Sequence, residues 1–218
     1  MLKQRVRNKH LTNSSKKWLQ RQLNDKYVIQ ARNDGYRSRA TFKIMEIQQK
    51  YSIINSNSVV LDLGASPGGW SQFVAPLCKH VIAVDLLEMQ PLPNVDFIQG
   101  DFHSNETLDK IYKLINGRSI DVIISDMAPS TCGIPKIDHL RIVNLLEEVF
   151  TFAKQALSFG GALVAKTFQG GGSDILLKQL RSSFRKVSNF KPKSSRKESS
   201  ELYVICKGFL GNIDQIQP

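Results

Sequence analysis

The sequence predicts one α/β domain built on a mostly parallel sheet with helices on both faces. The first observation is an alternation, because short runs rich in Val, Ile and Leu take turns with longer segments of helical periodicity. The second is that several of these runs are almost continuously apolar, as in strands covered on both faces. The third is the length, since 218 residues suit a single self-supporting core. Strand alternating with helix is the pattern of a doubly wound sheet.

Six short runs have the composition of strands and end at polar or glycine residues. They are Ser58–Leu63, His80–Val84, Val95–Gln99, Ile120–Ser125, Ala162–Thr167 and Leu202–Cys206. Five further segments are expected to be helices: Ser38–Lys50, Trp70–Leu77, Asn105–Ile115, Ile137–Ser158 and Ser173–Phe184. In the longest of these, Leu140, Val143, Leu146 and Phe150 recur at helical spacing. Residues 211–218 are polar, and we expect a disordered tail there.

Positive charge gathers in two parts of the chain. The formal net charge is +11, but residues 1–43 carry twelve Lys or Arg against two Asp, and residues 178–198 carry eight against one Glu. The aromatic residues that lie among these cations are Trp18, Tyr27, Tyr36 and Phe190. A solvated surface explains any single run. Two runs with interleaved aromatics are typical of surfaces that bind single-stranded nucleic acid, so we expect a nucleic-acid partner.

Several classes of protein are disfavoured by composition. No stretch approaches 18 consecutive apolar residues, and the polar, basic N-terminus does not resemble a secretory signal. Cys78, Cys132 and Cys206 are scattered and odd in number, which indicates a reducing compartment rather than a disulfide framework. The histidines show no ligand spacing with one another or with the cysteines. We expect a cytoplasmic protein without a membrane segment or a metal, and nothing demands more than a monomer.

A glycine-rich turn follows the first expected strand, in the segment Asp62-Leu-Gly-Ala-Ser-Pro-Gly-Gly-Trp70. Gly64, Gly68 and Gly69 allow a tight turn from strand to helix and let a ligand approach the backbone closely. The spacing differs from the G-x-G-x-x-G fingerprint of dinucleotide sites and from the Walker phosphate loop. The turn therefore does not indicate a pyrophosphate ligand.

Three acids, Asp62, Asp85 and Asp101, lie at the ends of three consecutive expected strands. Ligands of doubly wound folds bind at this carboxyl edge. Asp85 can accept hydrogen bonds from both ribose hydroxyls of a nucleoside, and Asp101 can reach the edge of its base. S-adenosylmethionine fits these requirements, because it carries a nucleoside and needs no pyrophosphate cradle.

Four motifs in this order resemble the FtsJ/RrmJ-type ribose 2′-O-methyltransferases. The first is the glycine-rich turn, and the others are Ser125-Asp-Met-Ala-Pro129, Ala165-Lys-Thr-Phe-Gln-Gly170 and Lys193-Ser-Ser-Arg196 ahead of Glu201. The resemblance runs from about Trp18 to Gly208 and is nearest to the bacterial enzymes of large-subunit ribosomal RNA. It implies a Rossmann-like, S-adenosylmethionine-dependent methyltransferase fold with seven strands, one of them antiparallel. Residues 1–35 would be a basic RNA-binding arm and 36–210 the methyltransferase domain.

The resemblance also implies the site and the reaction. The implied catalytic tetrad is Lys43, Asp126, Lys166 and Glu201. The residues expected to contact the cofactor are Gly64, Gly68, Gly69, Trp70, Asp85, Asp101 and Asp126. The implied reaction is 2′-O-methylation of a uridine ribose in 23S ribosomal RNA, either naked or in the assembled large subunit. Transfer RNA or a messenger cap as substrate, and a non-catalytic RNA-binding assembly factor, are the open alternatives.

The residue types suit this chemistry. A ribose 2′-hydroxyl is a poor nucleophile that must lose its proton as it attacks the methyl group. Lys166 follows an apolar run where lysine is rarely placed without a partner, and it acts either as a neutral base or as a charged group that orients the hydroxyl. Cys132, three residues past Pro129, is a minor candidate for a cysteine nucleophile of the kind used in cytosine C5 methylation.

Overall fold

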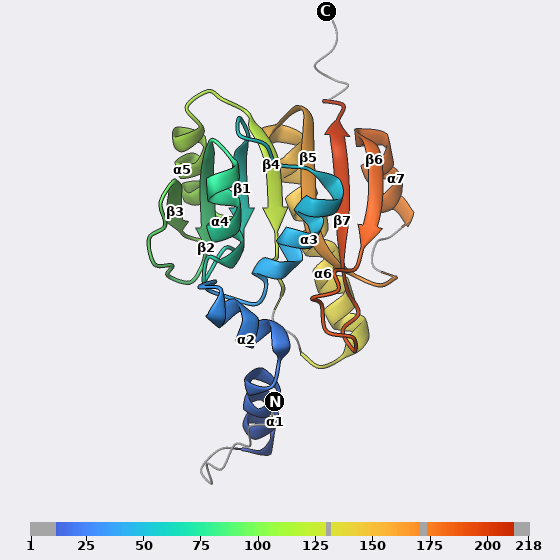
Figure 1. The fold of residues 1–218 in the computed structure, drawn as a ribbon. Coiled ribbons are helices and arrows are strands. Elements are labelled where there is room, and N and C mark those ends of the chain that lie inside the picture. Colours follow the sequence, from blue (N-terminus) through green and yellow to red (C-terminus); the bar gives the residue numbers. More distant parts are fainter. Residues whose placement is uncertain (1–11, 130–131, 171–173, 212–218) are drawn as a thin grey trace, which may run out of the picture.

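A computed structural model describes residues 12–129, 132–170 and 174–211, which form a seven-stranded sheet between two layers of helices (Figure 1). The strands are β1 (Val59–Leu63), β2 (His80–Asp85), β3 (Val95–Gln99), β4 (Ile120–Ser125), β5 (Leu157–Phe168), β6 (Phe184–Phe190) and β7 (Glu201–Phe209). The helices are α1 (Asn13–Leu23), α2 (Lys26–Asn33), α3 (Thr41–Tyr51), α4 (Gly69–Val74), η1 (Ala75–Leu77), α5 (Asn105–Ile115), α6 (Pro135–Ala156) and α7 (Asp174–Ser183). Residues 1–11 of the expected arm and 212–218 of the expected tail lie outside the described residues.

The sheet has the strand order β3-β2-β1-β4-β5-β7-β6. Strands β1 to β5 pair in parallel, whereas β7 runs antiparallel to both of its neighbours, β5 and β6. Strand β6 is therefore parallel to β5, and β7 is the one antiparallel strand of the described sheet. The predicted Rossmann-like methyltransferase fold is confirmed.

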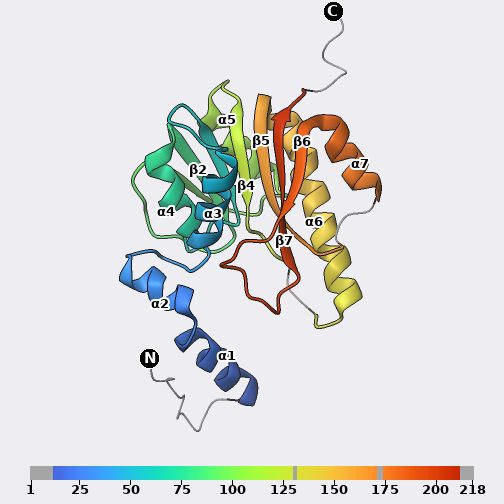
Figure 2. The ribbon, with the colours of Figure 1, turned by 45° about the vertical axis from the view of Figure 1, so that its right-hand side comes forward.

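Both faces of the sheet are buried. In β1, the side chain of Val60 packs in the core beneath α3 and α4, while Leu61 and Leu63 pack in the core beneath α5, α6 and α7. Figures 1 and 2 show α3 and α4 on one face and α6 and α7 on the other. Continuous apolar runs in the central strands follow from this double burial, because every second residue faces a different helical layer.

The sequence did not predict β6. The helix expected to end at Phe184 ends at Ser183, and Phe184 begins a strand at the edge of the sheet. Four of its seven residues are Arg, Lys, Ser or Asn, so the run lacks the apolar signal of a strand. Pairing with β7, from Phe184 opposite Phe209 to Phe190 opposite Tyr203, decides its conformation.

Two short helices also escaped prediction. Helices α1 and α2 lie beyond the edge of the sheet at which β1 to β5 end (Figure 1). Each begins at a capping side chain: Thr12 accepts a hydrogen bond from the Ser15 N–H, and Asp25 accepts one from the Tyr27 N–H. The described residues 13–33 of the basic segment are thus largely helical and lie next to the edge where ligands of this fold bind.

Candidate active site

A cavity of about 530 Å³ opens at the carboxyl edge of the sheet. Its wall contains four of the residues expected to bind the cofactor, which are Gly64, Asp85, Asp101 and Asp126. The apolar side chains of Phe102, Met127, Pro129 and Leu145 also line it. These four residues lie at or just after the ends of four parallel strands, and the parallel topology brings them together at one edge of the sheet.

The backbone around Gly64 fits closely against the next strand connection. Gly64 has a φ of +75°, and a Cβ there would lie 2.5 Å from Cγ of Met127. Asp85 is fixed beside it, since its Oδ2 accepts a hydrogen bond from the Ser66 N–H and its Oδ1 one from the Leu87 N–H, both at 2.8 Å. This carboxylate keeps further lone pairs for donors in the cavity.

The donor and acceptor set of the cavity suits a nucleoside. Asp85 and Asp101 present acceptors for ribose hydroxyls and an amino group, and Phe102 and Met127 offer apolar surface for a base. Asp101 is oriented by the N–H of His103, which donates to its Oδ1 at 2.9 Å. The residues present therefore fit the nucleoside part of S-adenosylmethionine.

Other residues of the glycine-rich turn lie outside the cavity wall. Gly68 is the N-cap residue of α4, and Gly69 and Trp70 are its first two residues. Trp70 is buried, and its indole N–H donates to the Ala40 carbonyl at 2.8 Å. Asp62 is also buried and accepts a hydrogen bond from the Ser71 hydroxyl at 2.6 Å. The spacing of these residues predicted a shared edge but not which of them face the ligand.

The four expected tetrad residues meet in one cluster of hydrogen bonds and ion pairs. Nζ of Lys166 lies 2.6 Å from Oδ1 of Asp126 and also donates to its backbone carbonyl at 2.6 Å. Nζ of Lys43 lies 2.9 Å from the carboxylate of Glu201 and 3.5 Å from Oδ2 of Asp126. Two ammonium groups and two carboxylates balance one another, which compensates part of the cost of burying each charge.

Sheet register explains why these residues meet. Asp126 follows the last residue of β4, and Lys166 lies near the end of β5. The antiparallel β7 begins at the same edge, so Phe168 pairs with Glu201 and Lys166 pairs with Tyr203. One reversed strand therefore brings its N-terminal end to the carboxyl ends of the others.

Tyr203 is a fifth member of the cluster that the sequence analysis missed. Its hydroxyl donates to Oδ1 of Asp126 at 2.6 Å and accepts a hydrogen bond from Nζ of Lys43 at 3.0 Å. Its ring is fully buried and lies 5.6 Å from the ring of Trp70. The available signal was the period of a strand, because residues 201 and 203 face the same side.

The surroundings set opposite protonation tendencies in the cluster. Burial opposes ionisation of Asp126, but the ammonium groups of Lys166 and Lys43 and the hydroxyl of Tyr203 outweigh it and lower the pKa of this carboxyl. Burial, together with the carboxylates of Asp126 and Glu201, raises the pKa of Tyr203 well above its ordinary value. The cluster thus contains an ionised Asp126 and a neutral phenol.

The loop before β7 supports the cluster from behind. The hydroxyl of Ser195 donates a hydrogen bond to Oε1 of Glu201 at 2.8 Å. The same loop is fixed to the N-terminal helices, because Arg39 forms hydrogen bonds to both the Asp25 carboxylate and the Ser194 carbonyl. Asp25 also pairs with Arg196, at 3.6 Å. Neither of these connections was indicated by the sequence, because Arg39 and Ser194 are 155 positions apart and Asp25 and Arg196 are even farther apart.

Cys132 lies outside this cluster. It is exposed, and its thiol and backbone N–H both donate to Oδ1 of Asp138. Cys78, Cys132 and Cys206 are all free thiols. Within the described part of the chain there is no group of side chains arranged to bind a metal, and no helix is long and apolar enough to cross a membrane.

The protein combines a doubly wound sheet that has one reversed strand with a nucleoside-sized cavity next to a cluster of lysines and carboxylates. These features define the Rossmann-like methyltransferase class. The family described as "FtsJ-like methyltransferase" matches residues 36–209, and the chain belongs to this family.

Two relatives are named "Ribosomal RNA large subunit methyltransferase E". The one from Francisella philomiragia is 51% identical over 201 residues, which are 91% of this chain and 98% of the relative. The one from Francisella tularensis subsp. holarctica is 53% identical with the same coverage. A crystal structure from Plasmodium falciparum, described as "a ribosomal RNA methyltransferase, putative", is also similar. It has a TM-score of 0.73 and 33% identity over 81% of this chain and 100% of that one.

Proposed function

We propose that the protein transfers a methyl group from S-adenosylmethionine to the ribose 2′-oxygen of a uridine in large-subunit ribosomal RNA. The names of its relatives support ribosomal RNA as the substrate. The observation that carries the proposal is the position of Asp126. This residue lines the cavity, and its Oδ1 lies 2.6 Å from Nζ of Lys166. The methyl donor and the acceptor oxygen would meet at this residue. We propose that the protein acts as a monomer in the cytoplasm.

The cavity residues would hold the cofactor. When bound, S-adenosylmethionine supplies an electrophilic methyl carbon on a cationic sulfur. Asp85 would accept hydrogen bonds from the ribose hydroxyls, and Asp101 one from the adenine amino group. Gly64, with Gly68, Gly69 and Trp70, would form the turn that lets the cofactor approach the backbone.

Lys166 would hold the acceptor hydroxyl. Both of its described contacts are with acceptor oxygens of Asp126, which favours an ammonium over a neutral amine. An ammonium has three N–H groups, so one remains to bind the 2′-oxygen and stabilise its developing negative charge. As the bond between the 2′-oxygen and the methyl carbon forms, the bond from that carbon to sulfur would break, the neutral thioether would leave, and the hydroxyl proton would pass to water. Lys43 and Glu201 would hold the side chains of Asp126 and Lys166 in position.

Purified protein, tritiated S-adenosylmethionine and undermethylated large ribosomal subunits test this proposal, with naked ribosomal RNA and transfer RNA in parallel. The RNA is digested to nucleosides and the labelled product is identified by chromatography. We expect label in 2′-O-methyluridine from large-subunit RNA. Label in a base, or in transfer RNA alone, contradicts the proposal.

A further inference from the structure

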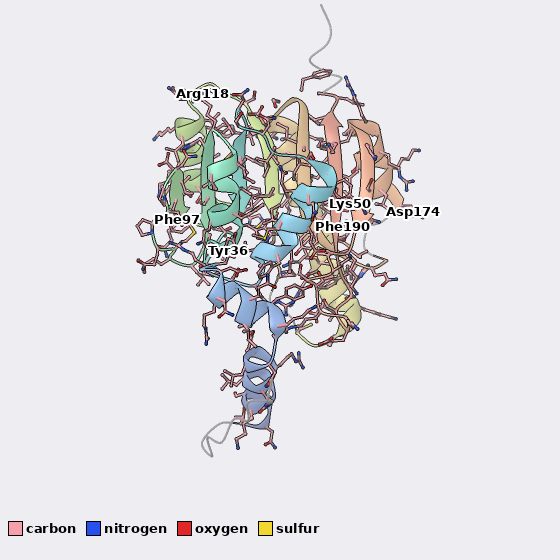
Figure 3. All side chains as sticks on the ribbon, in the orientation of Figure 1. Tyr36, Lys50, Phe97, Arg118, Asp174 and Phe190 are labelled. Atoms are coloured by element: carbon pink, nitrogen blue, oxygen red, sulfur yellow. The ribbon has the colours of Figure 1, made fainter. Side chains whose placement is uncertain are left out.

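A second groove, of about 640 Å³, lies between α2, α3 and the segment that follows β6. It is separate from the cofactor cavity, and the two share no lining residue. Its aromatic lining residues are Tyr27, Phe42 and Phe190, and its lysines are Lys50 and Lys193. Figure 3 shows Lys50 and Phe190 side by side at the end of α3.

We propose that this groove binds an unpaired stretch of the RNA substrate, with a base against its aromatic side chains and the adjacent phosphates on its lysines. The inference rests on the proposed RNA substrate and assigns a contact surface to it. Aromatic rings flanked by cations recognise single-stranded RNA, since every base has a face that stacks and every nucleotide a phosphate.

The three aromatic side chains of the groove differ in exposure. Phe42 is 8% exposed and is the most buried of them. The ring of Tyr27, from α2, lies 5.5 Å from that of Phe42, and the ring of Phe190, from β6, lies against Tyr51 at 5.6 Å. Tyr27 and Phe190 are half-buried, so each is braced by the protein and keeps surface available to a ligand.

The lysines are placed for phosphates. Nζ of Lys50 lies 4.5 Å from the ring centre of Phe190, and Lys50 and Lys193 are both exposed. An exposed lysine can turn towards a phosphate while a base takes its place over the ring. Nζ of the exposed Lys26, which does not belong to the groove lining, lies 4.7 Å from the ring centre of Tyr27.

The acids near the groove are already engaged. Both carboxylate oxygens of Glu46 accept backbone hydrogen bonds, at 2.6 Å from the Lys193 N–H and at 2.8 Å from the Ser194 N–H. Asp25 pairs with Arg39 and Arg196. The charge of Asp25 is therefore compensated by two arginines, and the Glu46 carboxylate is held by backbone donors. In the groove lining, Lys50 and Lys193 outnumber this one carboxylate, which favours a polyanion.

The groove is close in structure to the proposed reaction site. Phe42 precedes Lys43 in α3, and Lys193 lies in the same loop as Ser195, which binds Glu201. An RNA segment bound in the groove would lie near the tetrad residues without occupying the cofactor cavity. The groove is thus suited to nucleotides that flank the modified one.

Fluorescence anisotropy with a fluorescein-labelled decauridylate tests the groove without any need for methyl transfer. In the double variant Tyr27→Leu/Lys50→Gln, leucine keeps apolar contact with Phe42 but removes the flat ring. We expect its dissociation constant to rise about 10-fold, and the slope of log affinity against log salt to fall by about 0.7. The single variant Lys50→Gln changes an exposed side chain and leaves the core intact, and we expect its dissociation constant to rise about 3-fold.

The matched control is Tyr112→Leu/Lys113→Gln, an exposed pair of the same residue types on α5, and it should bind like the wild type. Wild-type affinity in both groove variants overturns the proposal. So does a loss seen only with assembled subunits and not with RNA, because that result indicates a protein partner. If the wild type binds the oligonucleotide through the groove but methylates no RNA, the proposed function fails and the groove stands.

Discussion

The hydroxyl of Tyr203 lies 2.6 Å from Oδ1 of Asp126 and 3.0 Å from Nζ of Lys43, so one neutral phenol joins two ionised side chains. Lys166 reaches the same Asp126 oxygen from the other side. The cluster is therefore a connected network in which Asp126 has three partners. Such a network fixes geometry, and its members are expected to contribute unequally to activity and to stability.

The change Lys166→Ala should abolish most methyl transfer. It removes the only group proposed to contact the acceptor oxygen, and we expect the rate at saturating substrates to fall at least about 100-fold. Binding of S-adenosylmethionine, measured by calorimetry, should change little. An active Lys166→Ala enzyme would show that the tetrad assignment is wrong, and the exposed change Lys113→Ala serves as the control.

The change Tyr203→Phe should affect stability more than rate. The buried ring stays, but Asp126 and Lys43 lose a hydrogen bond that involves a charged group, worth about 1.5–3 kcal/mol. Lys43 and Asp126 remain 3.5 Å apart and can close the gap. We expect the free energy of unfolding in urea to fall by about 2 kcal/mol and the rate to fall less than about 10-fold. A rate loss as large as that of Lys166→Ala would instead make Tyr203 a proton-transfer group.

The change Asp85→Ala should weaken cofactor binding first. The variant loses the carboxylate proposed to bind the ribose hydroxyls, so we expect the dissociation constant of S-adenosylmethionine to rise about 10- to 100-fold. Asp85→Asn keeps the size of the side chain and one acceptor oxygen, which serves either the Ser66 or the Leu87 N–H, so its loss of affinity should be smaller than that of Asp85→Ala. Asp96→Ala, an exposed acid on the neighbouring strand, is the control. Unchanged affinity in calorimetry rules out the assigned contact.

Asp62 should make stability depend on pH. Burial raises its pKa from 3.8 to about 7, while the hydrogen bond from Ser71 opposes the rise. The neutral carboxyl is favoured in the folded protein, so its stabilising contribution is complete below pH 3.8 and is lost as the pH rises through 7. Asp62→Asn does not titrate. From pH 5 to pH 8, the free energy of unfolding of the wild type, measured in urea, should fall by about 2–3 kcal/mol relative to that of this variant. A difference independent of pH contradicts the assignment.

The Asp25 carboxylate should hold the loop before β7 in place. Asp25→Asn removes the charge that binds Arg39 and Arg196, and the loop 191–200 then loses its tie to α2. We expect trypsin to cleave this lysine-rich loop about 5-fold faster under native conditions, as mapped by mass spectrometry. Asp34→Asn, which removes an exposed charge at the end of the same helix, should not change the pattern. Equal cleavage in the two variants would show that the ion pairs do not restrain the loop.

The sequence by itself determined the local elements whose signals are strong. The apolar runs of β1, β2, β4 and β5 are buried on both faces, so composition alone marks them as strands. The acids that follow these strands also have to share an edge, because parallel strands end together. For the site, the resemblance carried by four motifs implied Lys43, Asp126, Lys166 and Glu201 as a tetrad, and the structure brings these four side chains together.

Only the tertiary structure decided what depends on partners distant in the chain. Strand β6 is polar and takes its conformation from pairing with β7. Tyr203 enters the cluster because β7 runs antiparallel and pairs it with Lys166. Trp70 and Asp62 share a turn with Gly64, yet they are buried while Gly64 lines the cavity. Periodicity reports burial along one element, whereas the neighbours of a side chain depend on register and packing between elements.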